Sequence, residues 1–328
     1  MPGHVVAIVL LAALLHAAWN ALVKAGSQPF LTSVLVASGA AVISAFALPL
    51  LPSPAYASWP YLGASTCIHF FYFSLLAAAY RHGDMSHAYP LMRGCAPLLV
   101  AVLSVPLLGE HLSAQQYAAI ACISAGIFGL WFAAPALPPP PSAPLPAAQA
   151  RPHAADAQAA PSGRDTQAAP GAADAHAAQR ASGAQAGPGA GGAEGGASRG
   201  RGTVYSLLNA MAIAAYTLVD GIGVRKSGAP AAYTMWLFLL SASGLLAWTL
   251  LRRARELAAY ASKYWRVAAL GGVGTLSSYG LALWAMTAAP VAAVAALRET
   301  AILFAAAIAA LFLREKIGMR RGAAISLI

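Results

Sequence analysis

Charged side chains are scarce in this sequence of 328 residues, where Asp, Glu, Lys and Arg together make up 9%. A soluble domain carries about 25% of such residues. With 59% hydrophobic residues, no soluble core would hide the apolar surface. Apolar runs of about 20 residues recur along the chain, which is typical of transmembrane helices. The composition therefore predicts an all-α polytopic membrane protein that lies in a lipid bilayer.

Acidic residues are the scarcer kind, since 10 Asp and Glu stand against 20 Lys and Arg. In a soluble protein such an excess of base would suggest a nucleic-acid partner. Here most basic residues flank the apolar runs, where they act as topology signals. We therefore expect no nucleic acid among the partners of this chain.

Cysteine and the familiar catalytic motifs are nearly absent. Cys67, Cys95 and Cys122 all lie in apolar runs, and we expect them to be small buried side chains. There is no nucleotide-binding loop, no His-Glu-x-x-His and no Gly-x-Ser-x-Gly. His82 and His87 form a single pair, whereas di-iron enzymes with such pairs need several. The sequence thus predicts no cofactor, no metal site and no enzymatic activity.

Nine apolar runs are long enough to cross a bilayer, and a tenth begins near Gly318. The first run lacks the basic start of a signal peptide, so we interpret it as a retained helix. The tenth is too short to span, and we expect the last helix to be short or truncated. The predicted spans are 4–23, 31–51, 58–79, 86–108, 113–133, 203–223, 231–251, 264–286 and 291–313.

The stretch between the fifth and sixth runs has a different composition, rich in Ala, Pro and Gly. It lacks the apolar residues that would offset the entropy of ordering, which predicts a disordered linker over 134–202. The chain then divides into a first five-helix repeat (1–133), this linker, and a second five-helix repeat (203–328).

The two halves resemble each other around an arginine and a glutamate. Arg93 and Glu110 in the first half have the same spacing as Arg298 and Glu315 in the second. A unit of five helices that is repeated once must enter the membrane from opposite sides, because five is odd. Inverted repeats of this kind are common in transporters, whose substrate site lies near the midplane between them.

Three stretches carry a resemblance to a known family: "LLHAAWNALVKAG" (14–26), "AYPLMRGCAPLLVAVLSVPLLGEHLS" (88–113) and "ALRETAILFAAAIAALFLREKIG" (296–318). They resemble EamA-type members of the drug/metabolite transporter superfamily. The resemblance implies ten helices in two inverted repeats, a multi-pass protein of the cytoplasmic (inner) membrane, and transport of small metabolites.

Arg93 and Arg298 lie inside apolar runs, where an arginine costs about 2.5–3.5 kcal/mol on insertion scales. Three interpretations remain open. Each side chain could snorkel to the interface, hold a carboxylate or phosphate of a substrate, or form a structural ion pair. For Arg298 the candidate ion-pair partners are Asp220 and Glu299 of a neighbouring subunit.

Other polar and aromatic side chains complete the set of candidates. His16 and Asn20 are four residues apart and form a polar stripe along the first helix. Such a stripe either lines a pathway or joins helices. Glu110 and Glu315 follow apolar runs, and we interpret them as structural or gating residues. The substrate or pathway candidates are His16, Trp19, Asn20, Tyr72, Tyr89, Arg93, Tyr216, Asp220, Tyr279, Arg298 and Glu299.

The sequence as a whole favours a secondary transporter that works by alternating access, with its substrate in a central cavity between the repeats. We expect a small-molecule substrate of anionic or zwitterionic character, such as an amino acid or organic acid. Protons are a candidate coupling ion, with His16, Asp220 and Glu299 as the groups to carry them. The alternatives are a membrane-embedded enzyme and a non-transporting membrane sensor or scaffold. The sequence leaves the oligomeric state open.

Two inferences about orientation disagree. One side of the membrane carries nearly all loop Lys and Arg, with short-loop clusters near Arg252 and Arg314, and the other carries Arg225 and Lys226. The positive-inside rule then places the linker in the cytoplasm and the N-terminus outside. The family resemblance implies instead that both chain ends are cytoplasmic. We favour the charge distribution, because short loops carry most of it.

Overall fold

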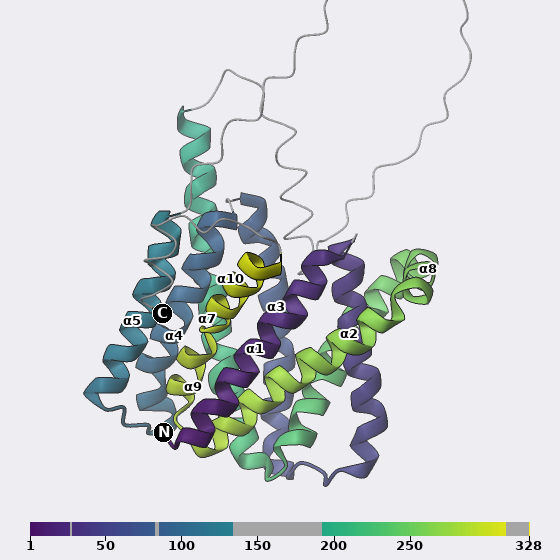
Figure 1. Cartoon of the computed structure of the whole chain (residues 1–328), viewed down its shortest axis with the longest axis horizontal. Coiled ribbons are helices and arrows are strands. Elements are labelled where there is room, and N and C mark those ends of the chain that lie inside the picture. Colours follow the sequence, from purple (N-terminus) through teal and green to yellow (C-terminus); the bar gives the residue numbers. More distant parts are fainter. Residues whose placement is uncertain (27, 83–84, 134–191, 313–327) are drawn as a thin grey trace, which may run out of the picture.

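The computed structural model describes residues 1–26, 28–82, 85–133, 192–312 and 328, and helices are the only regular structure in those ranges (Figure 1). In a helix the backbone N–H and C=O groups form hydrogen bonds with each other. This is necessary in the bilayer core, because no water is present there to bind them. The helices are α1 (Gly3–Ala25), α2 (Pro29–Ala47), α3 (Trp59–His82), α4 (Met85–Leu108), α5 (Ala114–Ala133), α7 (Gly192–Ser227), α8 (Pro230–Ala288), α9 (Val291–Arg298) and α10 (Ala301–Phe312), with short 3₁₀ turns at Leu48–Leu50 and Tyr56–Ser58.

Seven helical segments of the described chain are long and apolar enough to cross a membrane, and α5 supplies a shorter apolar stretch. One of the seven, α8, is folded back on itself, because its backbone leaves helical geometry at Arg253 and Tyr264. We call residues 230–252 its first limb and 265–288 its second limb. Large apolar side chains such as Phe71 and Val102 lie exposed, as lipid-facing residues do. The chain is a multi-pass membrane protein.

The two halves run in opposite directions. In Figure 1, α1 rises from the end that carries the N-terminus, whereas α7, the first helix of the second half, descends towards that end. We call the end with the N-terminus the N-terminal end, and the opposite end, where α5 finishes and α7 begins, the linker end. Two inverted five-helix repeats, as predicted, explain this arrangement.

The first helix of each half packs against the other half. α1 lies against α8, α9 and α10, while α7 lies against α3 and α4. The result is two bundles. The first bundle consists of α3, α4, α5 and α7; the second bundle consists of α1, the second limb of α8, α9 and α10. Any relative motion of the bundles therefore opens or closes the space between helices of both repeats.

Buried apolar side chains join the two bundles at the N-terminal end. This core draws on the last turns of α4 and α7 and on the first turns of α1 and α9. At the same end, Gly109 and Gly228 have positive φ angles of 66° and 63°, which permit the tight turns after α4 and α7. The core residues include Val5, Val9, Val100, Leu218, Leu283 and Val294.

Two sequence predictions need correction, and a third needs added detail. The predicted span 291–313 is long and apolar enough to cross a membrane over residues 291–308, but a two-residue break separates α9, which ends at Arg298, from α10, which starts at Ala301. Helix α7 begins at Gly192, so the last part of the predicted disordered linker is helical. Cys67 and Cys122 are exposed on the outside of the helices, not buried, while Cys95 is partly buried.

Several predictions lie outside the described residues. They are the disorder of 134–191, the side chain of Glu315 and the short tenth helix from Gly318.

Candidate functional site

A cavity of about 360 Å³ lies between the two bundles, and both repeats line it. Its volume is within the range of small-molecule sites, about 300–1,000 Å³. The lining reaches Val23, Tyr80 and Tyr89, near the linker end of their helices. Several other lining residues, such as His16, His69 and Thr275, come from the middle of the helices. The cavity therefore extends from the middle of the molecule towards the linker end.

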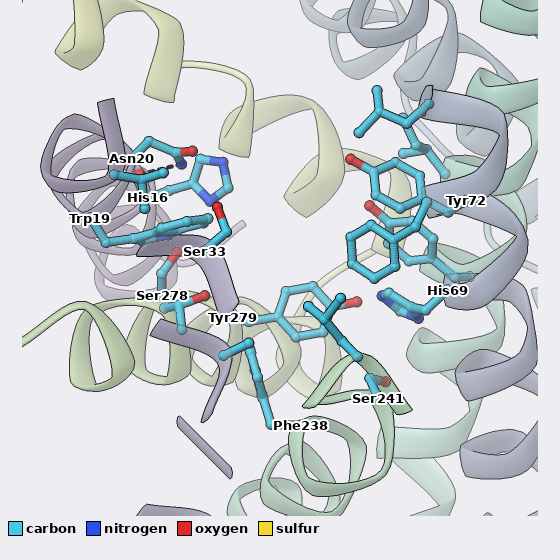
Figure 2. Close-up of a pocket in the computed structure, with 18 of the residues that line it drawn as sticks. His16, Trp19, Asn20, Ser33, His69, Tyr72, Phe238, Ser241, Ser278 and Tyr279 are labelled. Carbon is cyan, nitrogen blue, oxygen red and sulfur yellow. Dashed lines mark hydrogen bonds between the residues drawn. The ribbon is translucent and has the colours of Figure 1, made fainter. Parts of the chain in front are cut away.

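Opposite walls of the cavity come from opposite bundles (Figure 2). His16, Trp19 and Asn20 of α1 face it on one side, and His69 and Tyr72 of α3 face it on the other. The wall residues are held by their own contacts. The Asn20 amide donates to the His16 carbonyl at 2.7 Å, and the His16 ring meets the edge of Trp19 at 5.4 Å.

Aromatic rings make up much of the remaining wall. The His69 ring stacks on Tyr216 of α7 with centroids 4.4 Å apart, and Tyr216 meets Tyr72 at 5.9 Å. Phe238 and Tyr279, from the two limbs of α8, meet edge to face at 6.1 Å. Such rings offer broad apolar contact area with a few polar atoms at their edges.

Arg93 of α4 lines the cavity, and its charge is paired with that of Glu299, which lies outside the cavity lining. Its Nε lies 2.9 Å from Glu299 Oε2, and the two side chains are 17% and 8% exposed. Neither atom has a hydrogen bond of good geometry, so the contact is an ion pair and not an aligned hydrogen bond. The pair joins the first bundle to the break between α9 and α10, where the backbone bonds shorten to the i→i+3 pattern.

Arg298 lines the same cavity, and no carboxylate of the described residues lies within ion-pair distance of it. Its Cζ lies 5.0 Å from the centroid of the Tyr279 ring, in a cation–π contact. The Tyr279 hydroxyl donates to Asp220 Oδ2 at 2.6 Å, and the Tyr233 hydroxyl donates to Oδ1 at 3.1 Å. The candidate ion pair of Arg298 with Asp220 does not form in this structure, where the Asp220 oxygens accept the hydroxyls of Tyr233 and Tyr279.

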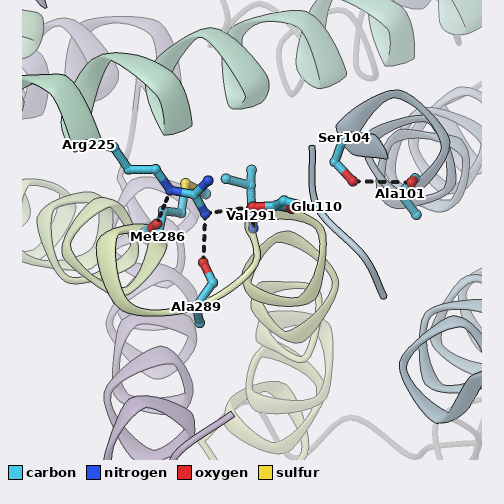
Figure 3. A network of polar contacts seen from close by, with 7 residues as sticks. All are labelled: Ala101, Ser104, Glu110, Arg225, Met286, Ala289 and Val291. Carbon is cyan, nitrogen blue, oxygen red and sulfur yellow. Dashed lines mark hydrogen bonds and ion pairs between the residues drawn. The ribbon is translucent and has the colours of Figure 1, made fainter. Parts of the chain in front are cut away.

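A cluster of polar contacts lies at the N-terminal end of the molecule, and Figure 3 shows these contacts. Arg225 at the end of α7 donates from Nη2 to Glu110 Oε1 at 2.6 Å and to the Ala289 carbonyl at 2.9 Å, and from Nε to the Met286 carbonyl at 2.7 Å. The same Glu110 oxygen accepts the Val291 N–H at 2.8 Å. We call these residues the clasp. Glu110 and Arg225 belong to the first bundle and the three backbone groups to the second, so the clasp ties the bundles together.

The family model for EamA-like transporters matches this chain twice, over residues 4–132 and over residues 200–328. The chain belongs to the EamA-like transporter family. The two matches correspond to the two repeats of the fold. The comparison with curated proteins gives no match.

Among solved structures, one described as "Crystal structure of protein" resembles this EamA-like chain with a TM-score of 0.61. The two are 19% identical, and the likeness covers 100% of this chain and 94% of the other. At that identity the likeness shows a shared fold and nothing about the substrate.

The cavity of this EamA-like protein gathers nine of the eleven candidates that the sequence suggested. Asp220 and Glu299 are the other two, and they lie behind the wall as partners of Tyr279 and Arg93. The nine that line the cavity are His16, Trp19, Asn20, Tyr72, Tyr89, Arg93, Tyr216, Tyr279 and Arg298.

Sequence reasoning missed several lining residues. Asn209 is a buried amide inside an apolar stretch, and that contrast alone would have identified it. Ser33, Ser241 and Ser278 also line the cavity. Serine is common in membrane helices and carries no distinctive signal, so only the packing of the helices reveals these positions.

Proposed function

We propose that the protein is a secondary transporter that moves a small metabolite across the cytoplasmic (inner) membrane by alternating access. The substrate occupies the cavity between the bundles. The observation that carries this proposal is the cavity itself, which extends towards the linker end and stops above the core at the N-terminal end. Membership of a transporter family favours transport over the two alternatives, a membrane-embedded enzyme and a non-transporting sensor.

Alternating access requires that the closed end can open while the other end closes. The clasp and the core beneath it close the N-terminal end, and both are built from contacts between bundles. Because the repeats are inverted, each helix of one repeat has a counterpart of opposite direction in the other repeat. An equivalent closure at the linker end would come from these counterparts. Opening one end and closing the other then amounts to rocking one bundle against the other.

The transport is secondary, and exchange, facilitated diffusion or proton coupling would each fit this geometry. The groups available to carry a proton are His16 in the cavity wall and the two carboxylates behind it, Asp220 and Glu299. The substrate is an anionic or zwitterionic small molecule, because arginine side chains face the cavity.

Uptake into proteoliposomes tests this function. Purified protein should give saturable uptake of at least one labelled compound from a panel of amino acids and organic acids. Ser241→Trp fills the cavity from its wall, and we expect it to abolish that uptake. Ser262→Trp is the matched control, because Ser262 lies exposed in the same helix, α8, and should keep the activity. Equal uptake by the two variants would exclude the cavity as the pathway.

A further inference from the structure

The two arginines of the cavity differ in how their charges are met. Arg93 has Glu299 at 2.9 Å. In the part of the chain that the structure describes, no carboxylate lies within ion-pair distance of Arg298, whose guanidinium packs on the Tyr279 ring. An arginine within a membrane protein is costly unless it pairs or faces a polar cavity. A ligand that supplies the missing negative charge would complete the contacts of Arg298.

The N–H donors of the Arg298 guanidinium are available to a ligand, because among the described residues none of them makes a hydrogen bond or an ion pair to a side chain. A planar fork of donors matches a carboxylate or phosphate with two parallel hydrogen bonds. Tyr279 is held in place by its bond to Asp220, so Asp220 acts as a positioning residue for the arginine.

Among the described residues that line the cavity there is no carboxylate for a positively charged substrate group. Asp220 is 0% exposed and Glu299 is 6% exposed, and neither belongs to the cavity lining. The oxygens of Asp220 accept two tyrosine hydroxyls, and Glu299 is paired with Arg93. Within the described ranges, an ammonium group in the cavity would meet ring faces and neutral oxygens but no carboxylate.

We propose that Arg298 binds the carboxylate or phosphate of an anionic substrate whose apolar body lies against the aromatic walls. This inference rests on the proposed transport function and narrows its substrate class from anionic or zwitterionic to anionic. Arg93 has a different role in this scheme: with Glu299 it connects the bundles behind the binding site.

Ligands that share one ring test the charge preference. Benzoate, phenyl phosphate, phenylalanine and benzylamine are added to the purified protein in detergent, and the shift in unfolding temperature gives the apparent affinity. We expect benzoate or phenyl phosphate to stabilise the protein, and the preferred one of the two shows which anionic group fits. Phenylalanine and benzylamine should bind at least about tenfold more weakly, because their ammonium groups lack a partner.

Substitutions of Arg298 test whether this residue causes the preference for anionic ligands. Arg298→Ala should weaken anion binding by about tenfold or more, and Arg298→Lys should weaken it less, since it keeps the charge but loses the fork. Arg253→Ala is the control, because Arg253 pairs with Glu256 at a surface position. Unchanged anion binding in Arg298→Ala would overturn the assignment. Equal binding of phenylalanine by the wild type, or binding of no anion in the panel, would overturn the substrate class.

A labelling experiment on the wild type avoids any folding defect of the variants. Phenylglyoxal reacts with unpaired guanidinium groups, and mass spectrometry locates the adducts. Arg298 should react faster than Arg93, and benzoate or phenyl phosphate should protect it. Faster reaction of Arg93, or no protection by either anion, would contradict the proposal. The transport function is tested separately by Ser241→Trp, so it can survive the failure of this inference.

Discussion

Arg93 and Glu299 come from different repeats and meet at 2.9 Å behind the cavity wall. Both side chains are largely buried, so the charge of each is compensated mainly by the opposite charge of the other. Loss of one partner from such a pair costs about 3–5 kcal/mol, because the remaining charge stays buried and unpaired, whereas replacement of both partners is often tolerated. At the scale of residues, we expect the loss of one partner to affect the stability of the protein more than its binding of substrate.

A double-mutant cycle tests that expectation. We expect Arg93→Met and Glu299→Met each to lower the free energy of unfolding by about 3–5 kcal/mol, and the double variant to lose less than either single one. Reversible denaturation in mixed detergent micelles provides the free energies. Additive losses would show that the two charges do not depend on each other.

Single residues also show what the sequence could reveal. The two arginines were identifiable because a guanidinium in an apolar run has a high cost. The partner of Arg93 was not, since Glu299 lies far along the chain and reaches it only through the packing of α4 against α9. The same reason explains why the Arg225–Glu110 pair could not be predicted.

At the scale of elements, α2 and α8 approach each other through glycines. A Cβ at Gly39 would collide with the carbonyl group of Ala268, and a Cβ at Gly272 would lie 2.7 Å from the backbone N of Ala40. Small residues let membrane helices come close enough for backbone contact. Gly63 in α3 offers a comparison, because a Cβ there would have nothing within 4 Å.

This contrast predicts opposite effects for one substitution. Gly39→Ala should destabilise the protein by about 1–3 kcal/mol, since the added methyl group forces α2 away from α8. Gly63→Ala should leave stability unchanged or raise it by up to about 1 kcal/mol, because alanine favours the helix. Unfolding temperatures of both variants in the same detergent decide the matter. A loss of equal size at both positions would mean that the close approach is unimportant.

Element prediction succeeded where composition dominates and failed where tertiary contacts decide. Long apolar runs are sufficient to indicate spans such as α1, α4 and the limbs of α8. The break between α9 and α10 has no such signal, because no Gly or Pro lies between Arg298 and Ala301. The break coincides with Glu299, whose side chain pairs with Arg93 of another helix.

At the scale of the whole molecule, the charges of the two ends differ. The linker end carries the basic residues around the turn within α8, including Arg252, Arg255 and Lys263, while Arg225 and Lys226 lie at the N-terminal end. The positive-inside rule predicts that the linker end is cytoplasmic. The cavity would then extend towards the cytoplasm in this conformation, and the clasp would close the outer side.

The most direct test of alternating access measures thiol accessibility from both sides of the membrane. The native cysteines are replaced, and single cysteines are introduced by Ser241→Cys in the cavity wall and Val294→Cys in the core beneath the clasp. An impermeant thiol reagent is applied to right-side-out and inside-out vesicles. Ser262→Cys, on the exposed turn within α8, reports which side the linker end faces.

In the wild-type background, the thiol at 241 should react from the linker side, and the thiol at 294 should react slowly, from the opposite side. Arg225→Met removes the side-chain donors of the clasp, so reaction at 294 should become faster and reaction at 241 slower. Lys226→Met, at the neighbouring position, should change neither rate. Reaction of both thiols from both sides would indicate an open channel, and no reaction at 294 after Arg225→Met would contradict alternating access through this cavity.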